Sequence, residues 1–270
     1  REFMGVFGDL VTVTNRMDDI QLLFFSQAES YRAYQEQYAP HMPNSTGFYN
    51  PWVDRLVVFN QVTAPHVSRA RDWVAREEAR YREQYAGQPR AQEQIGDWRR
   101  RTDAEISRFA EVQTLNTLRE RGAPPLFFLA GGASPPRLEN GLVFEGLAVY
   151  CETGRPGEKD AGRVRALREA EAAGRLIPLA DLVDLRSPLG LGAVGDPARV
   201  DLAYAQAWSL VHFLMQDAYR ESFFRYLRQV RDPGRFESVR RTRAMRMLTR
   251  ALGVSPARLE ELWREHVRAL

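Results

Sequence analysis

The sequence RFAEVQTLNTLRERG at residues 108–122 and NGLVFEGLAVYCE at 140–152, with a Pro- and Gly-rich apolar connection between them, predicts two helices joined by a loop. In the first helix, large apolar residues recur at every third position and predict one core-facing stripe. These residues are Phe109, Val112, Leu115 and Leu118. Gly122 is predicted to end this helix, Pro124-Pro125 to prevent its continuation, and Asn140 to cap the second one.

Each of these two helices carries one carboxylate of interest. Glu145 lies among the apolar residues Leu142, Gly146 and Val149, so we expect it to be partly buried and to need a partner. That partner is either an arginine or Glu111 sharing a proton with it, which would raise one of the two pKa values. Glu111 lies beside the apolar stripe and is otherwise interpreted as a solvated glutamate.

Short apolar runs upstream predict a small sheet. The run at 20–25 (IQLLFF) reads as a buried strand, and 47–49 with 55–60 reads as a β-hairpin around a Pro/Asn turn. A helix at 27–38 follows the first strand, with Ser26 and Glu29 at the spacing of a capping box.

The remainder of the chain is predicted to be helical. A helix begins at Pro65 and is broken at 87–89, and further helices are expected at the ranges that follow. They are 90–121, 160–174, 202–217 with Asp201 as N-cap, 220–230, 237–252, and a last helix begun by Ser255-Pro256. The fold class is therefore α+β, with a small N-terminal β-sheet lobe with packed helices and a larger C-terminal helical body. We divide it into 1–64, 65–153 and 154–270 within one integrated domain.

Five segments together resemble a family of zinc peptidases. Peptidases of the HExxH type carry two zinc-binding histidines four residues apart on one helix face, and the glutamate between them polarises water. The matching segments are LLFFSQAESYRAY, GFYNPWVDRLVVFN, AEVQTLNTLRERGAP, FEGLAVYCE and YAQAWSLVHFL. They resemble an uncharacterised bacterial family of HExxH-type peptidase-like domains in the gluzincin zinc metallopeptidase group, which implies a zincin-like fold.

The resemblance assigns roles to individual residues. Ala110 and Thr114 stand where the two metal-binding histidines are expected, so the motif is degenerate (AEVQT). Glu111 corresponds to the general base, here vestigial, and Glu145 to the third metal ligand. Tyr204 is a candidate oxyanion stabiliser by analogy with related peptidases. We therefore expect no cofactor, and zinc only if the site works with unusual ligands.

Three functions follow from these residues. The first is a metallopeptidase-like domain that has lost zinc-dependent activity and acts as a peptide- or protein-binding or structural module. The second is an active hydrolase that uses Glu111 and Glu145 as an acid/base pair. The third is an Arg-rich binder of anionic ligands, because Lys159 is the single lysine among 38 basic residues. Whether the protein is an enzyme stays open at this point.

Length and composition limit which classes of protein the chain can belong to. At 270 residues and 44% hydrophobic, the chain can bury a full core, and no apolar run is long enough to span a bilayer. The arginine clusters at 99–101 and 240–250 come without a nucleic-acid-binding motif, and the second, with Arg243, Arg246 and Arg250, has the pattern of a solvated helix face. We expect no nucleic-acid partner.

The remaining reactive side chains are read as structural. Cys151 is the only cysteine, which excludes an internal disulfide and a CxxC metal site, and it is predicted to be an inert thiol. His212, on an otherwise apolar helix, is predicted to be a hydrogen-bonded structural histidine. The first residues lack a signal peptide, but the chain does not start with Met, so localisation is unknown and export stays open.

Overall fold

The computed structural model describes residues 2–9, 20–40, 42, 45–50, 53–129, 141–183, 185, 197–231 and 243–270. The chain forms two compact units, of which the sheet unit comprises residues 21–118 and the helical unit residues 1–20 and 119–270. Strands occur in the sheet unit and a largely helical body makes up the helical unit, so the described part of the chain is α+β as predicted. No described helix is long and apolar enough to cross a membrane.

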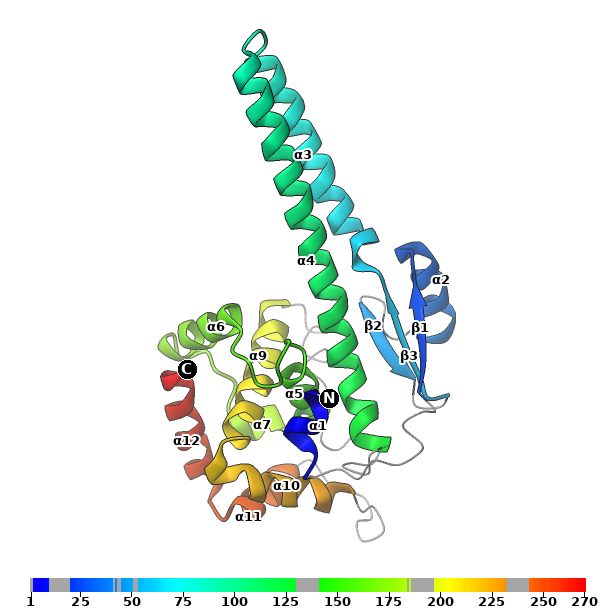
Figure 1. The fold of residues 1–270 in the computed structure, drawn as a ribbon. Helices are drawn as coiled ribbons and strands as arrows, with labels where there is room; N and C mark the ends of the chain where they lie inside the picture. The colour runs from blue at the N-terminus through cyan, green and yellow to red at the C-terminus, as the bar shows by residue number, and fades with distance from the viewer. Residues whose placement is uncertain are drawn as a thin grey trace. The chain divides into compact units, whose positions relative to one another are not determined.

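The sheet unit is built on a mixed sheet, three-stranded in the described part of the chain. Its strands are β1 (Gln21–Phe25), β2 (Gly47–Asn50) and β3 (Arg55–Phe59), in the spatial order β1-β3-β2. β3 pairs in parallel with β1 and antiparallel with β2, so the predicted strand and hairpin are both confirmed. The predicted burial of the first strand is wrong, because β1 lies at the edge of the sheet and Leu22 and Phe24 are 55% and 48% exposed. Helix α2 (Ala28–Tyr38) covers one face (Figure 1), where Tyr31 packs on Phe59 with ring centroids 4.7 Å apart.

The predicted capping box of α2 is wrong. The N-cap residue is Gln27, and its side chain makes no capping hydrogen bond. Instead the Ala28 backbone N–H donates to Oγ1 of Thr63, at 3.0 Å. Thr63 belongs to the short 3-10 helix η2 (Gln61–Thr63). A hydroxyl that is distant in sequence therefore satisfies a donor that the local motif was expected to satisfy.

Two long helices form a hairpin in the sheet unit. α3 (Pro65–Gln84) and the first part of α4 (Pro89–Leu129) lie side by side and antiparallel (Figure 1), and the turn between them includes Gly87 at a φ of 81°. This confirms the break predicted at 87–89. Tyr81 of α3 and Trp98 of α4 meet edge to face with ring centroids 5.9 Å apart.

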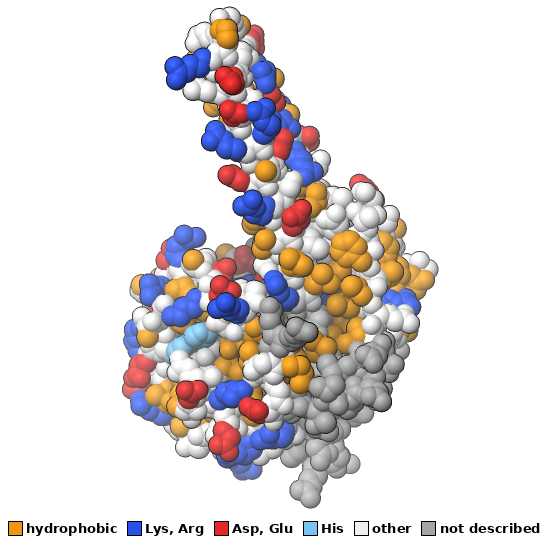
Figure 2. All heavy atoms as spheres, in the orientation of Figure 1, with side chains coloured by type: hydrophobic (Ala, Val, Ile, Leu, Met, Phe, Trp, Pro, Cys, Tyr) orange, Lys and Arg blue, Asp and Glu red, His pale blue; other side chains and the backbone are white. Residues whose placement is uncertain are grey.

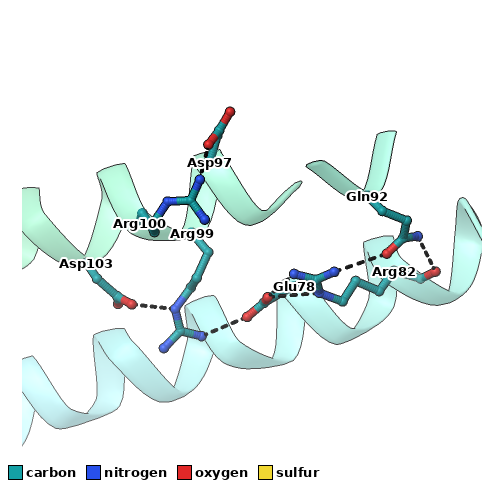
Figure 3. A network of polar contacts seen from close by, with 7 residues as sticks. All are labelled: Glu78, Arg82, Gln92, Asp97, Arg99, Arg100 and Asp103. Atoms are coloured by element: carbon teal, nitrogen blue, oxygen red, sulfur yellow. Dashed lines mark hydrogen bonds and ion pairs between the residues drawn. The ribbon is translucent and has the colours of Figure 1, made fainter. Parts of the chain in front are cut away.

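Charged side chains of both signs cover this hairpin (Figure 2), and several form a network (Figure 3). Arg99 contacts Glu78 of α3 at 3.3 Å and Asp103 of its own helix at 2.5 Å. Arg100 pairs with Asp97. Two of the three arginines in the 99–101 cluster therefore have carboxylate partners, which reduces the positive charge that they offer to an anionic ligand.

The predicted end of the second long helix is wrong. α4 continues through Gly122, Pro124 and Pro125 to Leu129. A proline inside a helix costs roughly 3 kcal/mol because it lacks an N–H and its ring crowds the preceding turn. Here Ala123, Pro125 and Phe127 are all buried, two of them in the core of the helical unit. Tertiary packing of this turn offsets the local cost.

The predicted core stripe of α4 is also wrong. Phe109, Val112 and Leu115 are 58%, 45% and 50% exposed. The buried face consists of Ala110, Thr114 and Thr117. A Cβ built on Gly47 of β2 would lie 2.8 Å from Cγ2 of Thr117, so the helix approaches the sheet too closely for large side chains. Small residues therefore face the sheet.

The helical unit buries its core between short and medium helices. They are α1 (Glu2–Phe7), α5 (Gly141–Tyr150), α6 (Ala161–Ala172), α7 (Leu179–Val183), α9 (Pro197–Leu214), α10 (Asp217–Arg231), α11 (Arg243–Leu252) and α12 (Pro256–Ala269). Phe7 of α1 packs on Phe127 at a ring-centroid distance of 4.6 Å. Trp208 of α9 and Trp263 of α12 are fully buried. The first helix of the chain therefore completes the C-terminal core.

Local predictions for the helical unit had mixed outcomes. Asp201 is not an N-cap, because α9 begins at Pro197 and Asp201 lies inside it. Ser255 does cap α12, since its hydroxyl accepts from the Arg258 backbone N–H at 3.2 Å. In α11, Met245 and Leu248 are buried while Arg246 and Arg250 are exposed, which confirms the solvated arginine face for the described side chains. Asn140 lies outside the described residues.

Candidate functional site

The residues singled out from the sequence fall in both compact units. Ala110, Glu111 and Thr114 belong to the sheet unit, whereas Glu145 and Tyr204 belong to the helical unit. Each group is described within its own unit.

The two positions expected to carry metal ligands lie in a packed core. Ala110 is fully buried against the sheet, and Thr114 is 8% exposed. Oγ1 of Thr114 accepts from the Gln61 backbone N–H at 3.0 Å and donates to the Ala110 carbonyl oxygen at 2.9 Å. Next to it, Nε2 of Gln61 donates to Oγ1 of Thr117 at 2.7 Å. The Thr114 hydroxyl thus satisfies a buried backbone group.

Glu111 is exposed on the surface of α4. This agrees with its interpretation as a solvated glutamate, and it lies on the side of the helix away from the buried Ala110–Thr114–Thr117 face.

Glu145 is positioned by the close packing of α5 on α9. A Cβ on the next residue, Gly146, would lie 2.6 Å from the Ala207 carbonyl oxygen, so only glycine permits this approach. Glu145 Oε2 lies 3.9 Å from Nη1 of Arg121, and the two side chains are 23% and 20% exposed. The expectation that Glu145 is partly buried with an arginine partner is confirmed. Burial raises its pKa, and the Arg121 charge opposes that rise.

Arg121 contacts two further groups of the helical unit. Its Nη2 lies 3.2 Å from Oε1 of Glu120, and its guanidinium hydrogen-bonds the side chain of Tyr204. Tyr204, predicted as an oxyanion stabiliser, is thus brought to the same cluster as Glu145. We call Glu120, Arg121, Glu145 and Tyr204 the Arg121 cluster. Nε of Arg121 is buried and has no acceptor among the described residues.

Glu120 is a second ionisable residue of this cluster that the sequence analysis missed. Burial raises its pKa to about 7, the Arg121 charge lowers it, and the charges of Glu152 and Glu145 raise it further. Its side chain is 14% exposed. Strongly shifted carboxylates are typical of functional sites, although structural ion-pair networks show them too. The raised pKa of Glu120 therefore makes it a candidate functional residue of the Arg121 cluster.

A sequence signal for Arg121 was available. Residues 110, 114, 117 and 121 recur on one side of a helix, so the buried face of α4 extends in register to Arg121. The burial of Arg121 was not predicted because the helix was expected to end at Gly122. Residues at a frayed helix end are usually solvated.

The donor chemistry of these residues does not fit zinc. Structural and catalytic zinc sites are built from imidazole, thiolate and carboxylate groups. The Arg121 cluster supplies carboxylates and a guanidinium, and burial raises the pKa of the Cys151 thiol to about 12, far from a thiolate. In the described part of the chain, no group of three or more His, Cys, Asp or Glu side chains could hold a metal ion.

Comparison of the chain with protein-family models, with curated proteins and with solved structures finds no match.

Proposed function

We propose that this chain is a metallopeptidase-like, zincin-like domain without zinc-dependent peptidase activity, which binds an extended peptide or protein segment. The contact between Arg121 and Glu145 carries the first half of the proposal. Glu145 corresponds to the third metal ligand in the resembled family, and here an arginine supplies the positive charge beside it. The buried, hydrogen-bonded Thr114 supports the same conclusion from the sheet unit.

The outer edge of β1 supports the second half. The Gln21 backbone N–H donates to Asp54 and the Phe25 carbonyl accepts from Asn60, so residues 21, 23 and 25 turn their backbone groups towards β3. Residues 22 and 24 therefore turn theirs away from it. In the described residues no strand pairs with this edge.

Apolar side chains accompany these free backbone groups. Leu22 and Phe24 are 55% and 48% exposed, and hydrophobic side chains gather over this sheet (Figure 2). An edge strand with unpaired N–H and C=O groups and exposed alternate side chains is the arrangement that β-strand addition uses.

Metal content and proteolysis test the first half. We expect purified protein to hold no stoichiometric zinc by mass spectrometry and to leave casein intact. Stoichiometric zinc together with chelator-sensitive cleavage would overturn it.

Edge-strand binding is tested with a panel of extended apolar peptides and the substitution Leu22→Lys. We expect the amide NMR signals of residues 22 and 24 to shift when peptide is added to the wild-type protein. In the Leu22→Lys variant we expect no such shift. Val53→Lys is the matched control, because Val53 is 51% exposed but lies outside β1. Equal binding by both variants would sink the assignment to this edge.

The alternative is an active hydrolase, and one observation favours it. Glu120, with its pKa of about 7, and Glu145 both lie against Arg121. A carboxyl group that titrates near the working pH suits general acid/base catalysis. Any hydrolytic activity detected should then disappear in Glu120→Gln and in Glu145→Gln, and persist in Glu111→Gln.

A further inference from the structure

Two histidines distant in sequence meet where α12 packs on α9. Nδ1 of His212 lies 3.0 Å from Nε2 of His266, and the ring centroids are 5.1 Å apart. The other ring nitrogen of His266, Nδ1, lies 2.8 Å from Nε2 of Gln216. Both histidines are half-buried. The sequence analysis could not predict this pair, because the two histidines are 54 residues apart in the sequence.

The tautomers follow from the orientation of the Gln216 amide group, whose NH₂ group is placed against His266. An amide NH₂ group only donates, so Nδ1 of His266 accepts from Gln216. Neutral His266 then carries its proton on Nε2 and donates it to Nδ1 of His212. His212 consequently carries its own proton on Nε2. Both rings are neutral, and the chain of donors runs in one direction from Gln216 to His212.

Added protons break this chain. A proton on Nδ1 of His266 is tolerated if the Gln216 amide turns and accepts with its oxygen. A proton on Nδ1 of His212 instead faces the Nε2–H of His266, so two donors oppose each other at 3.0 Å. Two adjacent imidazolium rings would also repel each other.

The surroundings oppose protonation as well. Lys159 is the charged group that acts on both rings, and its Nζ donates to the backbone carbonyl oxygen of Leu270 at the end of α12, at 3.3 Å. Tyr150 of α5 faces His212 with ring centroids 6.4 Å apart, and Phe213 of α9 faces His266 at 5.6 Å. The pKa of His266 is lowered to about 4, mainly by burial and then by the neighbouring His212 and Lys159. The pKa of His212 is also lowered, by burial and then by Lys159.

We propose that His212, His266 and Gln216 form a proton-operated latch that holds the C-terminal half of α12 on α9 at neutral pH and releases it on acidification. The part of α12 up to Trp263 stays anchored independently of pH, because Trp263 is fully buried and its Nε1–H donates to Oγ of Ser209 at 3.0 Å. Release is therefore local, and it uncovers Val267, which is fully buried in the latched state.

The sign of the pH dependence follows from the lowered pKa values. A histidine that protonates less readily in the latched state contributes stability above its ordinary pKa of 6.5, and this is lost as the pH falls towards about 4. At pH 5 we expect the protection factors of the amides of residues 264–270 to be about tenfold lower than at pH 7.5, after discounting for the partial exposure of the rings.

Hydrogen exchange of the full chain, corrected for the intrinsic rate, tests the latch. The core amides of residues 208–211 should keep their protection at both pH values. The double variant His212→Gln/His266→Gln should lose the pH dependence at 264–270, while His66→Gln, which replaces an exposed histidine of α3, should keep it. A pH dependence that is equal in the double variant and the wild-type protein would overturn the latch.

A second measurement does not depend on the double variant folding. Proton NMR of the wild-type imidazoles should show His212 and His266 still neutral at pH 6, and their titration at lower pH should coincide with the loss of protection at 264–270. Titration of both rings at their ordinary pKa, or titration without loss of protection, would contradict the proposal.

Discussion

The guanidinium of Arg121 in α4 and the carboxylate of Glu145 in α5 lie 3.9 Å apart, and both residues belong to the helical unit. Because α4 runs on through Pro124 and Pro125, residue 121 is not a frayed terminus but part of a continuous helix that meets α5. The pair provides the charge balance around which the candidate site is arranged.

Removing the cation should destabilise the protein. Arg121→Gln leaves the Glu120 and Glu145 carboxylates close together without a counter-charge, and breaking a buried ion pair in this way costs about 3–5 kcal/mol. Because these side chains are still partly exposed, we expect a loss of about 1–3 kcal/mol in urea unfolding at pH 8. Arg100→Gln breaks an exposed pair, at 73% and 50% exposure, and should cost less than about 0.5 kcal/mol. Equal losses in both variants would contradict the importance of the Arg121 cluster.

Glu120→Gln should change how stability depends on pH. A folded pKa of about 7 against an ordinary value of 4.5 means that the folded state holds this proton more tightly, so this contribution to stability is present below pH 4.5 and is lost as the pH rises through 7. Glutamine stays neutral, so the variant should be more stable than the wild type at pH 8 by on the order of 2 kcal/mol and should show less change between pH 4.5 and 7.

The contribution of the histidine latch to stability changes with pH in the opposite direction over part of this range. The stability of the variant is therefore compared with that of the wild type at each pH. Glu111→Gln is the control, because Glu111 is exposed. If the free energy of unfolding of Glu120→Gln changed with pH in parallel with that of the wild type, Glu120 would not titrate with a raised pKa.

Gly146→Ala tests the approach of α5 to α9. The added methyl group would lie 2.6 Å from the Ala207 carbonyl oxygen and 2.8 Å from Cγ2 of Val211, so the helices must separate. Overpacking of this kind costs about 1–3 kcal/mol. Gly96→Ala is the matched control in α4, where the nearest atoms are flexible arginine ends at 3.6 Å. It should be neutral or stabilise by up to about 1 kcal/mol, because alanine is the better helix former. Thermal unfolding of both variants gives the comparison.

Thr114→Val tests whether the hydroxyl at this position is structural. The substitution keeps the shape but leaves the buried Gln61 N–H without its acceptor, so we expect a loss of about 1–3 kcal/mol in the free energy of unfolding. Thr114→Ser keeps the hydroxyl and should restore the Gln61 contact. Unchanged stability in the valine variant would show that another group accepts from Gln61.

Sequence patterns predicted the strands and the helical hairpin well because these depend on local chemistry. Alternation and apolar runs gave β1, β2 and β3, and Gly87 with Pro89 marked the turn between α3 and α4. Ser255 capped α12 as expected, since the cap and its recipient are three residues apart. The same kind of local rule failed at Ser26, where Thr63 provides the acceptor instead.

The candidate site was predictable only in part. The buried surroundings of Glu145 could be inferred from its apolar helix, and an arginine was one of the two partners expected for it. Which arginine it is depends on the course of α4. The raised pKa of Glu120 depends first on burial and then on the charges of Arg121, Glu152 and Glu145, which meet only in the fold. The pairing of His212 with His266 likewise requires the packing of α12 on α9.

The sequence alone predicted the α+β class and the order of the elements, because composition, periodicity and residue identity are local properties. The fold alone established which face of α4 is buried and which cation neutralises Glu145. Large apolar residues at every third position predicted a core stripe, yet the close approach of Gly47 to Thr117 leaves room only for small side chains, and Phe109, Val112 and Leu115 are exposed instead. Burial and charge balance depend on what packs opposite a residue, and that neighbour is distant in sequence.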